Sequence, residues 1–94
     1  MRILITTVQV PFVRGGAELL AEQLLGALIQ AGHEAEIVAI PFKWYPAERL
    51  LDQMLACRLL DITESAGTSI DRVIALKFPA YLMPHPNKVV WLVH

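Results

Sequence analysis

The first sixteen residues of the chain predict a buried strand, a short loop and a helix start in direct succession. Residues 2–8 are apolar and rich in β-branched side chains, which is typical of a buried strand. In the loop that follows, Pro11 fixes the backbone, and Gly15 and Gly16 precede a helical pattern. In an open α/β sheet such a junction lies at the carboxyl edge of a strand, where ligands bind and helix N–H groups suit an anion. The two glycines therefore mark the expected ligand-facing surface, although they do not name the ligand.

The rest of the chain alternates helical and strand patterns. The expected elements are a helix over 17–31 that Gly32 ends, a strand over 34–40, a helix over 47–63, and strands over 71–76 and 88–94. Strands that alternate with helices indicate βαβ units with right-handed crossovers and a parallel sheet. We therefore expect an α/β fold: an incomplete Rossmann-like sheet of about four strands in the order 3-2-1-4, with helices on both faces.

Size and composition indicate one small domain that begins a longer protein. The chain has 94 residues, of which 55% are hydrophobic and only 18% are charged, which is more apolar than is usual for a free-standing domain. In the expected sheet the apolar strand 88–94 lies at an edge, where an uncovered strand is a pairing hazard. We therefore expect the chain to self-associate through this strand or the apolar surface near it.

Charge and targeting signals exclude several classes of partner. The net charge of −1 gives no electrostatic reason to expect nucleic acid or an anionic membrane as a partner. No apolar run approaches the ~20 residues of a membrane span, and nothing resembles a signal peptide. The lone Cys57 is expected to be a buried or half-buried small hydrophobe in a reducing compartment. These features predict a cytoplasmic protein.

The paired glycines do not fit two common phosphate-binding motifs. A dinucleotide fingerprint needs Gly-x-Gly-x-x-Gly and an acidic residue after the second strand, and a P-loop needs Gly-Lys-Ser/Thr; the sequence has neither. Two interpretations stay open: Gly15 and Gly16 let the loop turn into the helix, or they let a diphosphate or sugar approach the backbone, which a Cβ would obstruct. Arg14 is a candidate cation beside this anion site, although a solvated role is commoner for a loop arginine. Glu18 is expected to cap the helix start.

Other polar residues have competing interpretations. His94 follows the fourth strand at the ligand edge, where it could hydrogen-bond a sugar or exchange a proton, or could be a frayed terminus. Lys77 follows the third strand and could face the same edge, although solvation is the commoner role. His33 and His85 are expected to be structural or solvated.

Two further groups of residues have side chains suited to chemistry or binding. Trp44 and Tyr45 could stack on a sugar ring, dock a lipid tail or simply cover the end of the sheet. The scattered histidines and the single cysteine show no metal-ligand spacing and no nucleophile arrangement, so no metal or cofactor is expected.

Four stretches together carry a family resemblance. They resemble the N-terminal half-domain of GT-B-fold glycosyltransferases. The four stretches are Met-Arg-Ile-Leu-Ile, the loop Arg-Gly-Gly-Ala-Glu, the turn Ala-Gly-His-Glu-Ala-Glu-Ile-Val and the final Lys-Val-Val-Trp-Leu-Val-His. The chain is similar, over essentially all of residues 1–94, to the retaining family that uses nucleotide-sugar donors, often called glycosyltransferase family four.

The resemblance implies a hexosyltransferase-type enzyme that transfers a sugar from a nucleotide-sugar to an acceptor with retention. It implies that Gly15 and Gly16 approach the donor diphosphate and that His94 is the catalytic candidate facing the sugar. Arg14 and Lys77 join the glycines as candidates for binding donor or acceptor because of their positions at the ligand edge, which the resemblance does not address. Residues 1–94 would form the N-terminal part of the Rossmann-like domain, and the C-terminal donor-binding domain would lie outside this chain.

On this interpretation the chain alone is expected to be inactive, and the longer protein could associate peripherally with a membrane. A non-catalytic α/β binding or interaction module with a flavodoxin-like outline remains the alternative.

Overall fold

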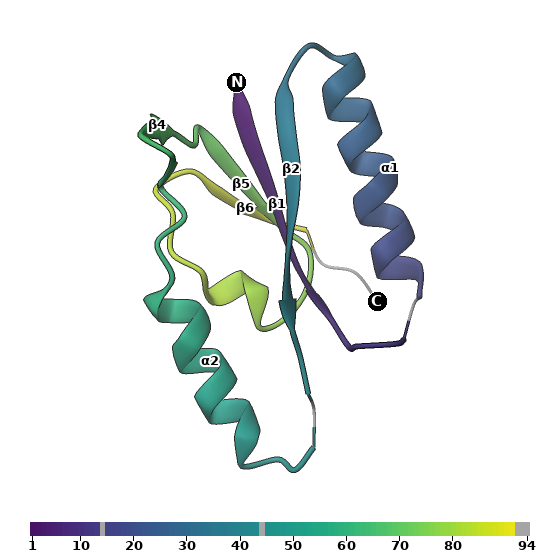
Figure 1. Ribbon diagram of the computed structural model, residues 1–94, viewed down its shortest axis with the longest axis vertical. Coiled ribbons are helices and arrows are strands. Elements are labelled where there is room, and N and C mark those ends of the chain that lie inside the picture. The colour runs from purple at the N-terminus through teal and green to yellow at the C-terminus, as the bar shows by residue number, and fades with distance from the viewer. Residues whose placement is uncertain (14, 44, 92–94) are drawn as a thin grey trace.

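The computed structural model describes residues 1–13, 15–43 and 45–91 and shows a sheet flanked by helices (Figure 1). The elements in chain order are β1 (Arg2–Gln9), α1 (Gly16–Gln30), β2 (Glu34–Pro41), α2 (Arg49–Leu59), β3 (Glu64–Ser65), β4 (Thr68–Ser69), β5 (Arg72–Ala75), the 3-10 helix η1 (Ala80–Leu82) and β6 (Lys88–Val90). The mixed α/β class, the four-stranded parallel sheet and the flanking helices confirm the expected fold class.

The strand order is β2-β1-β5-β6, so the expected order 3-2-1-4 is wrong. The third strand of the sheet, β5, pairs with β1 from Ile3↔Arg72 to Thr6↔Ala75, on the side of β1 away from β2. The burial of the strands explains this placement. The interior of β1 is buried throughout, whereas β2 alternates exposed and half-buried residues, which suits an edge strand.

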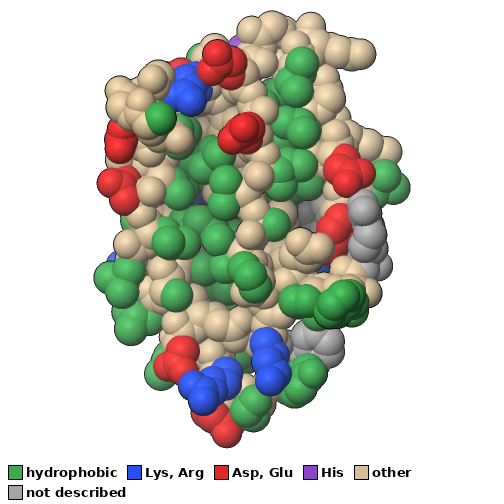
Figure 2. Space-filling view, in the orientation of Figure 1, with side chains coloured by type: hydrophobic (Ala, Val, Ile, Leu, Met, Phe, Trp, Pro, Cys, Tyr) green, Lys and Arg blue, Asp and Glu red, His purple; other side chains and the backbone are tan. Residues whose placement is uncertain are grey.

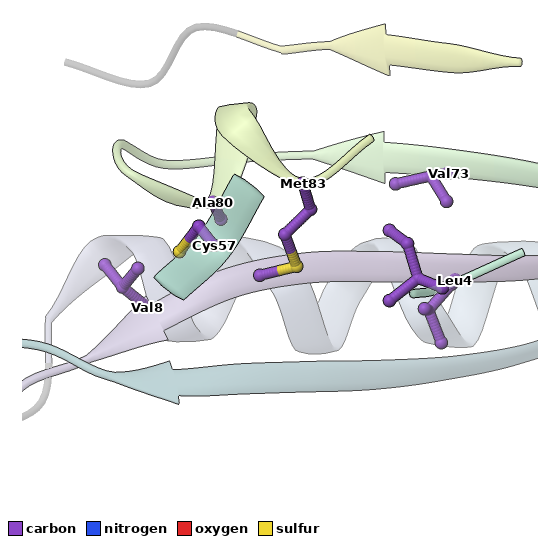
Figure 3. Close-up of a cluster of buried hydrophobic side chains, with 7 residues drawn as sticks. Leu4, Val8, Cys57, Val73, Ala80 and Met83 are labelled. Carbon is purple, nitrogen blue, oxygen red and sulfur yellow. The ribbon is translucent and has the colours of Figure 1, made fainter. Parts of the chain in front are cut away.

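The two helices cover opposite faces of the sheet. On one face, α1 contributes Ala21 and Leu24 to a cluster with Ile5 of β1. On the other face, Cys57 of α2 packs with Leu4 and with residues of η1 and β5; Figure 3 shows this cluster. Because right-handed crossovers place a helix on the opposite face when strand progression reverses, the return of the chain past β1 accounts for this division. The reversal creates a topological switch point between β1 and β5.

The second helix is shorter than the expected 47–63. It ends at Leu59, and Leu60 is extended. Asp61 Oδ1 accepts hydrogen bonds from the Thr63 hydroxyl at 2.6 Å and from its backbone N–H at 2.9 Å. These local bonds offer the backbone an alternative to another helical turn.

Two small elements were not expected from the sequence. The segment expected to be a loop around Gly67 forms the β3–β4 hairpin, whose turn residues Ala66 and Gly67 have φ of 51° and 82°. Positive φ at both central residues is typical of a two-residue hairpin turn. The other element is η1, whose Ala80 is buried.

The last strand lies at the edge of the sheet, as expected. β6 covers Lys88–Val90, and the expected remainder of this strand at 92–94 lies outside the described residues. Val89, Val90 and Trp91 are between 42% and 47% exposed. Among the helices that the structure describes, none combines the length and the apolar character needed to cross a membrane.

Candidate functional site

The carboxyl edge of the sheet brings two loops and a helix start together. β1 and β2 end side by side, with Gln9 paired in register with Pro41. The loop after β1 leads to the start of α1 at Gly16, and the loop after β2 leads to α2 (Figure 1). This edge adjoins the switch point between β1 and β5, which is where open α/β sheets bind ligands.

Neither glycine at the helix start is required by the fold itself. Gly15 is extended, with φ of −157°, and Gly16 is not among the residues with positive φ. A Cβ on Gly16 would meet nothing within 4 Å, and one on Gly15 would meet only Glu18 Oε2, at 3.6 Å. The left-handed residue of this loop is instead Phe12, with φ of 66°. The backbone geometry of this turn therefore does not require glycine at either position.

Glu18 caps the start of α1, as the sequence predicts. Its carboxylate oxygen Oε2 accepts a hydrogen bond of 2.8 Å from the backbone N–H of Gly15. A carboxylate in the first helical turn is also favoured by the helix dipole. Any anion that reaches this N–H group must therefore displace Glu18 or bind beside it.

The structure describes only some of the other predicted site residues. Lys77 is half-buried just beyond the end of β5, and it makes no hydrogen bond or ion pair with the part of the chain that is described. Arg14, Trp44 and His94 lie outside the described residues. The structure therefore places Gly15, Gly16 and Lys77 at the carboxyl edge.

Both histidines that were expected to be structural or solvated make local contacts. His85 Nε2 lies 2.8 Å from the carbonyl oxygen of Ile70, and its Nδ1 accepts a hydrogen bond from the Asn87 N–H. His33 Nδ1 lies 3.3 Å from the amino group of Met1. Cys57 is fully buried, and burial raises the pKa of its thiol, which confirms its role as a core hydrophobe.

A groove at the carboxyl edge was not predicted from the sequence. It has a volume of about 440 Å³ and lies between the loop after β1, with Pro11 and Val13, and the loop after β2, with Phe42 and Tyr45. Lys43, also in its wall, places its ammonium 4.9 Å from the centre of the Tyr45 ring. The aromatic composition of residues 41–46 was the only sequence signal for this groove, since its other wall comes from a distant segment.

One side chain of α2 fixes the loop that forms this groove. Gln53 Nε2 donates to the carbonyl oxygen of Lys43 at 2.6 Å, and Gln53 Oε1 accepts from the Lys43 N–H at 2.8 Å. This two-point contact clamps the loop to the first turns of α2. The opposite wall includes no comparable clamp among the described residues, and the side chain of Phe12, in the same loop but outside the lining, is fully exposed.

Comparisons with protein families, curated proteins and solved structures find no match for this chain. Among the described residues, no group of three or more His, Cys, Asp or Glu side chains has the arrangement of a metal site.

Proposed function

We propose that this chain is the N-terminal part of a retaining glycosyltransferase that transfers a sugar from a nucleotide-sugar to an acceptor. The observation that carries the proposal is the start of α1. Gly15 and Gly16 stand there at the ligand edge of the sheet, although neither the backbone nor the packing requires glycine. Because no side chain covers the backbone at these two positions, a diphosphate or sugar can approach it closely.

In this proposal the chain supplies one wall of a cleft. The N–H groups at the start of α1 stabilise the departing diphosphate, and Lys77, half-buried beyond β5, adds a positive charge near the same edge. The groove between Pro11 and Tyr45 holds the acceptor in position. His94 keeps the role that the resemblance implies, as the residue facing the sugar, and Arg14 serves as a cation near the diphosphate.

The remaining parts of the proposal concern the longer protein. A second domain would bind most of the nucleotide-sugar, so the chain alone would not turn over. No metal or organic cofactor is part of the proposal. We place the longer protein in the cytoplasm, with peripheral membrane contact compatible with its acceptor.

The test is an assay of the full-length protein with a panel of nucleotide-sugars. Gly16→Val is expected to lower the rate of transfer and weaken donor binding, because its side chain fills the space in front of the helix N–H groups. Gly26→Val, a glycine-to-valine change in the interior of α1, is the matched control, since a Cβ there also meets nothing within 4 Å. A gene that ends just after His94, or a full-length protein that binds no nucleotide-sugar, would refute the proposal.

A second candidate function rests on the observed strand order. An order in which the first strand lies between the second and third is that of flavodoxin-like sheets. This order favours the alternative of a non-catalytic α/β binding or interaction module. Such a module would fold and bind its partner as the chain stands, whereas the transferase proposal needs a second domain.

A further inference from the structure

A second groove lies near the amino-terminal ends of the strands, away from the proposed cleft. It has a volume of about 680 Å³, and its apolar lining includes Leu4, Val38, Ile62 and Ile70. Its polar lining is mainly acidic: Glu34, Glu36, Asp61 and Glu64. Figure 2 shows hydrophobic side chains gathered in the middle of this face, with acidic side chains around its upper part.

The β3–β4 hairpin forms one wall of this groove, and Arg2 attaches it to the sheet. The Arg2 guanidinium donates to Glu34 Oε2 through Nε at 3.0 Å and to the carbonyl oxygen of Thr68 in β4, also at 3.0 Å. The Arg2 backbone N–H donates to Asp71 Oδ2 at 2.7 Å. The one arginine in the lining is therefore already committed to structural contacts.

Three carboxylates of the lining, those of Glu36, Asp61 and Glu64, have no ionic partner among the described residues. Hydrogen bonds from the side chain and then the backbone of Thr63 lower the pKa of Asp61, which keeps that group charged at neutral pH. The groove thus offers an apolar floor beside uncompensated negative charge.

The other wall is β2, which has an unpaired edge. Among the described residues β2 pairs with β1 alone. The backbone N–H of Glu34 donates to the carbonyl oxygen of Met1, and that of Phe42 donates to the carbonyl oxygen of Gln9. The even-numbered residues of this segment therefore point their backbone N–H and C=O groups toward β1. The backbone N–H and C=O groups of successive residues in a strand point to opposite sides, so those of the odd-numbered residues point away from β1.

Three outward N–H groups therefore have no partner in the part of the chain that is described: those of Ala35, Ile37 and Ala39. Pro41 has the same outward parity, and proline is tolerated there because no ladder donor is lost. The position beside β2 is also the one that the order 3-2-1-4 would have filled with a strand. No strand among the described residues occupies this position beside β2.

We propose that the open edge of β2 binds an extended segment of another protein that carries basic and apolar residues. The side chains of β2 on the groove side read Glu34, Glu36, Val38. An added strand that matches this face carries lysine or arginine opposite the two glutamates and an apolar residue opposite Val38, where it meets the floor of the groove. Strand addition of this kind takes affinity from the backbone and specificity from alternate side chains.

Charge disfavours a second copy of this chain as the occupant. A second β2 would bring its own two glutamates to an acidic groove. The other edge strand, β6, has one lysine, Lys88, whose ammonium is bound to the carbonyl oxygens of Tyr81 at 2.5 Å and Met83 at 3.3 Å. The inference does not depend on the proposed transferase activity.

The test uses two fluorescein-labelled, end-capped peptides, Val-Thr-Val-Thr-Lys-Thr-Lys and its reversed sequence, with binding followed by fluorescence anisotropy. We expect at least one of the two peptides to show saturable binding, and we expect salt to weaken that binding. The same peptide with glutamate in place of lysine should not bind. N-methylation of the peptide nitrogens that face β2 should abolish binding, which tests the backbone pairing without altering the protein.

Two protein variants test the contacts. Ala39→Pro removes an outward N–H without breaking a native bond and should weaken binding about tenfold or more, whereas Ala39→Val keeps the N–H and should bind. Glu36→Lys should weaken binding about fivefold. Glu48→Lys makes the same charge change at the N-cap of α2 and should have no effect.

Several outcomes would overturn the inference. The inference would be refuted if neither the peptide nor its reversed sequence bound. It would also be refuted if the wild type and Glu36→Lys bound the peptide equally well. Unchanged binding of the N-methylated peptide would exclude pairing along β2, even where Ala39→Pro fails to fold. If the protein instead dimerises and Ala39→Pro abolishes the dimer, the occupant is a second copy and the proposal of a basic segment is wrong.

Discussion

The carboxylate of Glu18 accepts a 2.8 Å hydrogen bond from the N–H of Gly15, so the chain closes its own helix start with a negative charge. Glu18→Ala removes this cap and should lower the free energy of unfolding by about 1 kcal/mol. Urea denaturation measures the change. Gln23→Ala, on an exposed position of the same helix, is the control. Equal stability of both variants would show that the cap contributes nothing.

Gly16→Ala should separate stability from binding. The change introduces no clash and no strained φ, so the stiffer backbone should raise the free energy of unfolding of this chain by about 0.5 kcal/mol. In the full-length protein the same methyl group should weaken binding of the nucleotide-sugar, measured by calorimetry. A loss of stability in this chain would mean that glycine is structurally required there after all.

Thr6→Val and Thr7→Val should each stabilise the chain. Both hydroxyls are buried in β1, and neither has a hydrogen-bond partner among the described residues. Replacing an unpaired buried hydroxyl with a methyl group of similar shape removes a desolvation penalty of about 1 kcal/mol. Thermal and urea unfolding test both variants. Destabilisation by either valine would reveal a partner for that hydroxyl.

The thiol of Cys57 should report the opening of the core. Burial keeps it from solvent and raises its pKa, so the reactive thiolate is scarce in the folded chain. Labelling by Ellman's reagent should be slow in buffer and fast in urea, and the native rate should fall in the more stable Thr6→Val variant. Rapid labelling in buffer would show that α2 detaches from the sheet without global unfolding.

Val90→Lys should reduce self-association at the β6 edge. Val90 lies in an edge strand whose own lysine is bound to backbone carbonyls, so no free charge among residues 88–91 protects this edge. Sedimentation velocity over a range of concentrations should show oligomers of the wild type and fewer of the variant. Leu19→Lys, at an exposed position of α1, is the matched control. A wild type that stays monomeric at high concentration would contradict this expectation.

The sequence predicted the individual elements better than their arrangement. Periodicity located β1, α1 and β2 within about one residue at most ends, and Gly32 ends α1 with a φ of 93°, as a glycine C-cap does. Strand order could not be read in the same way, because it depends on which side of β1 the chain returns to. The glutamates of β2 were a usable signal, since charges on alternate positions suit an edge strand.

The sequence placed single residues at the carboxyl edge, with Lys77 after β5 and a cap at the helix start, but it did not show how the loops combine there. Gly15, Gly16 and Glu18 are local in sequence, so their positions follow from the strand-to-helix junction. The groove that contains Tyr45 could not be predicted, because it forms only when two loops far apart in sequence meet. The strained backbone of Phe12 left no sequence signal, since phenylalanine rarely adopts a positive φ.

The pairing of β1 also determines when this chain can begin to fold during its synthesis. β2 follows β1 after one helix, whereas α2 and the β3–β4 hairpin must also be made before β5. Until Val73 leaves the ribosome, the edge of β1 that pairs with β5 has no partner, and the Leu4 side chain lacks its contact with Val73. Until β5 is made, the most buried strand of the sheet therefore has one edge without its native partner, and such an edge can mispair or associate.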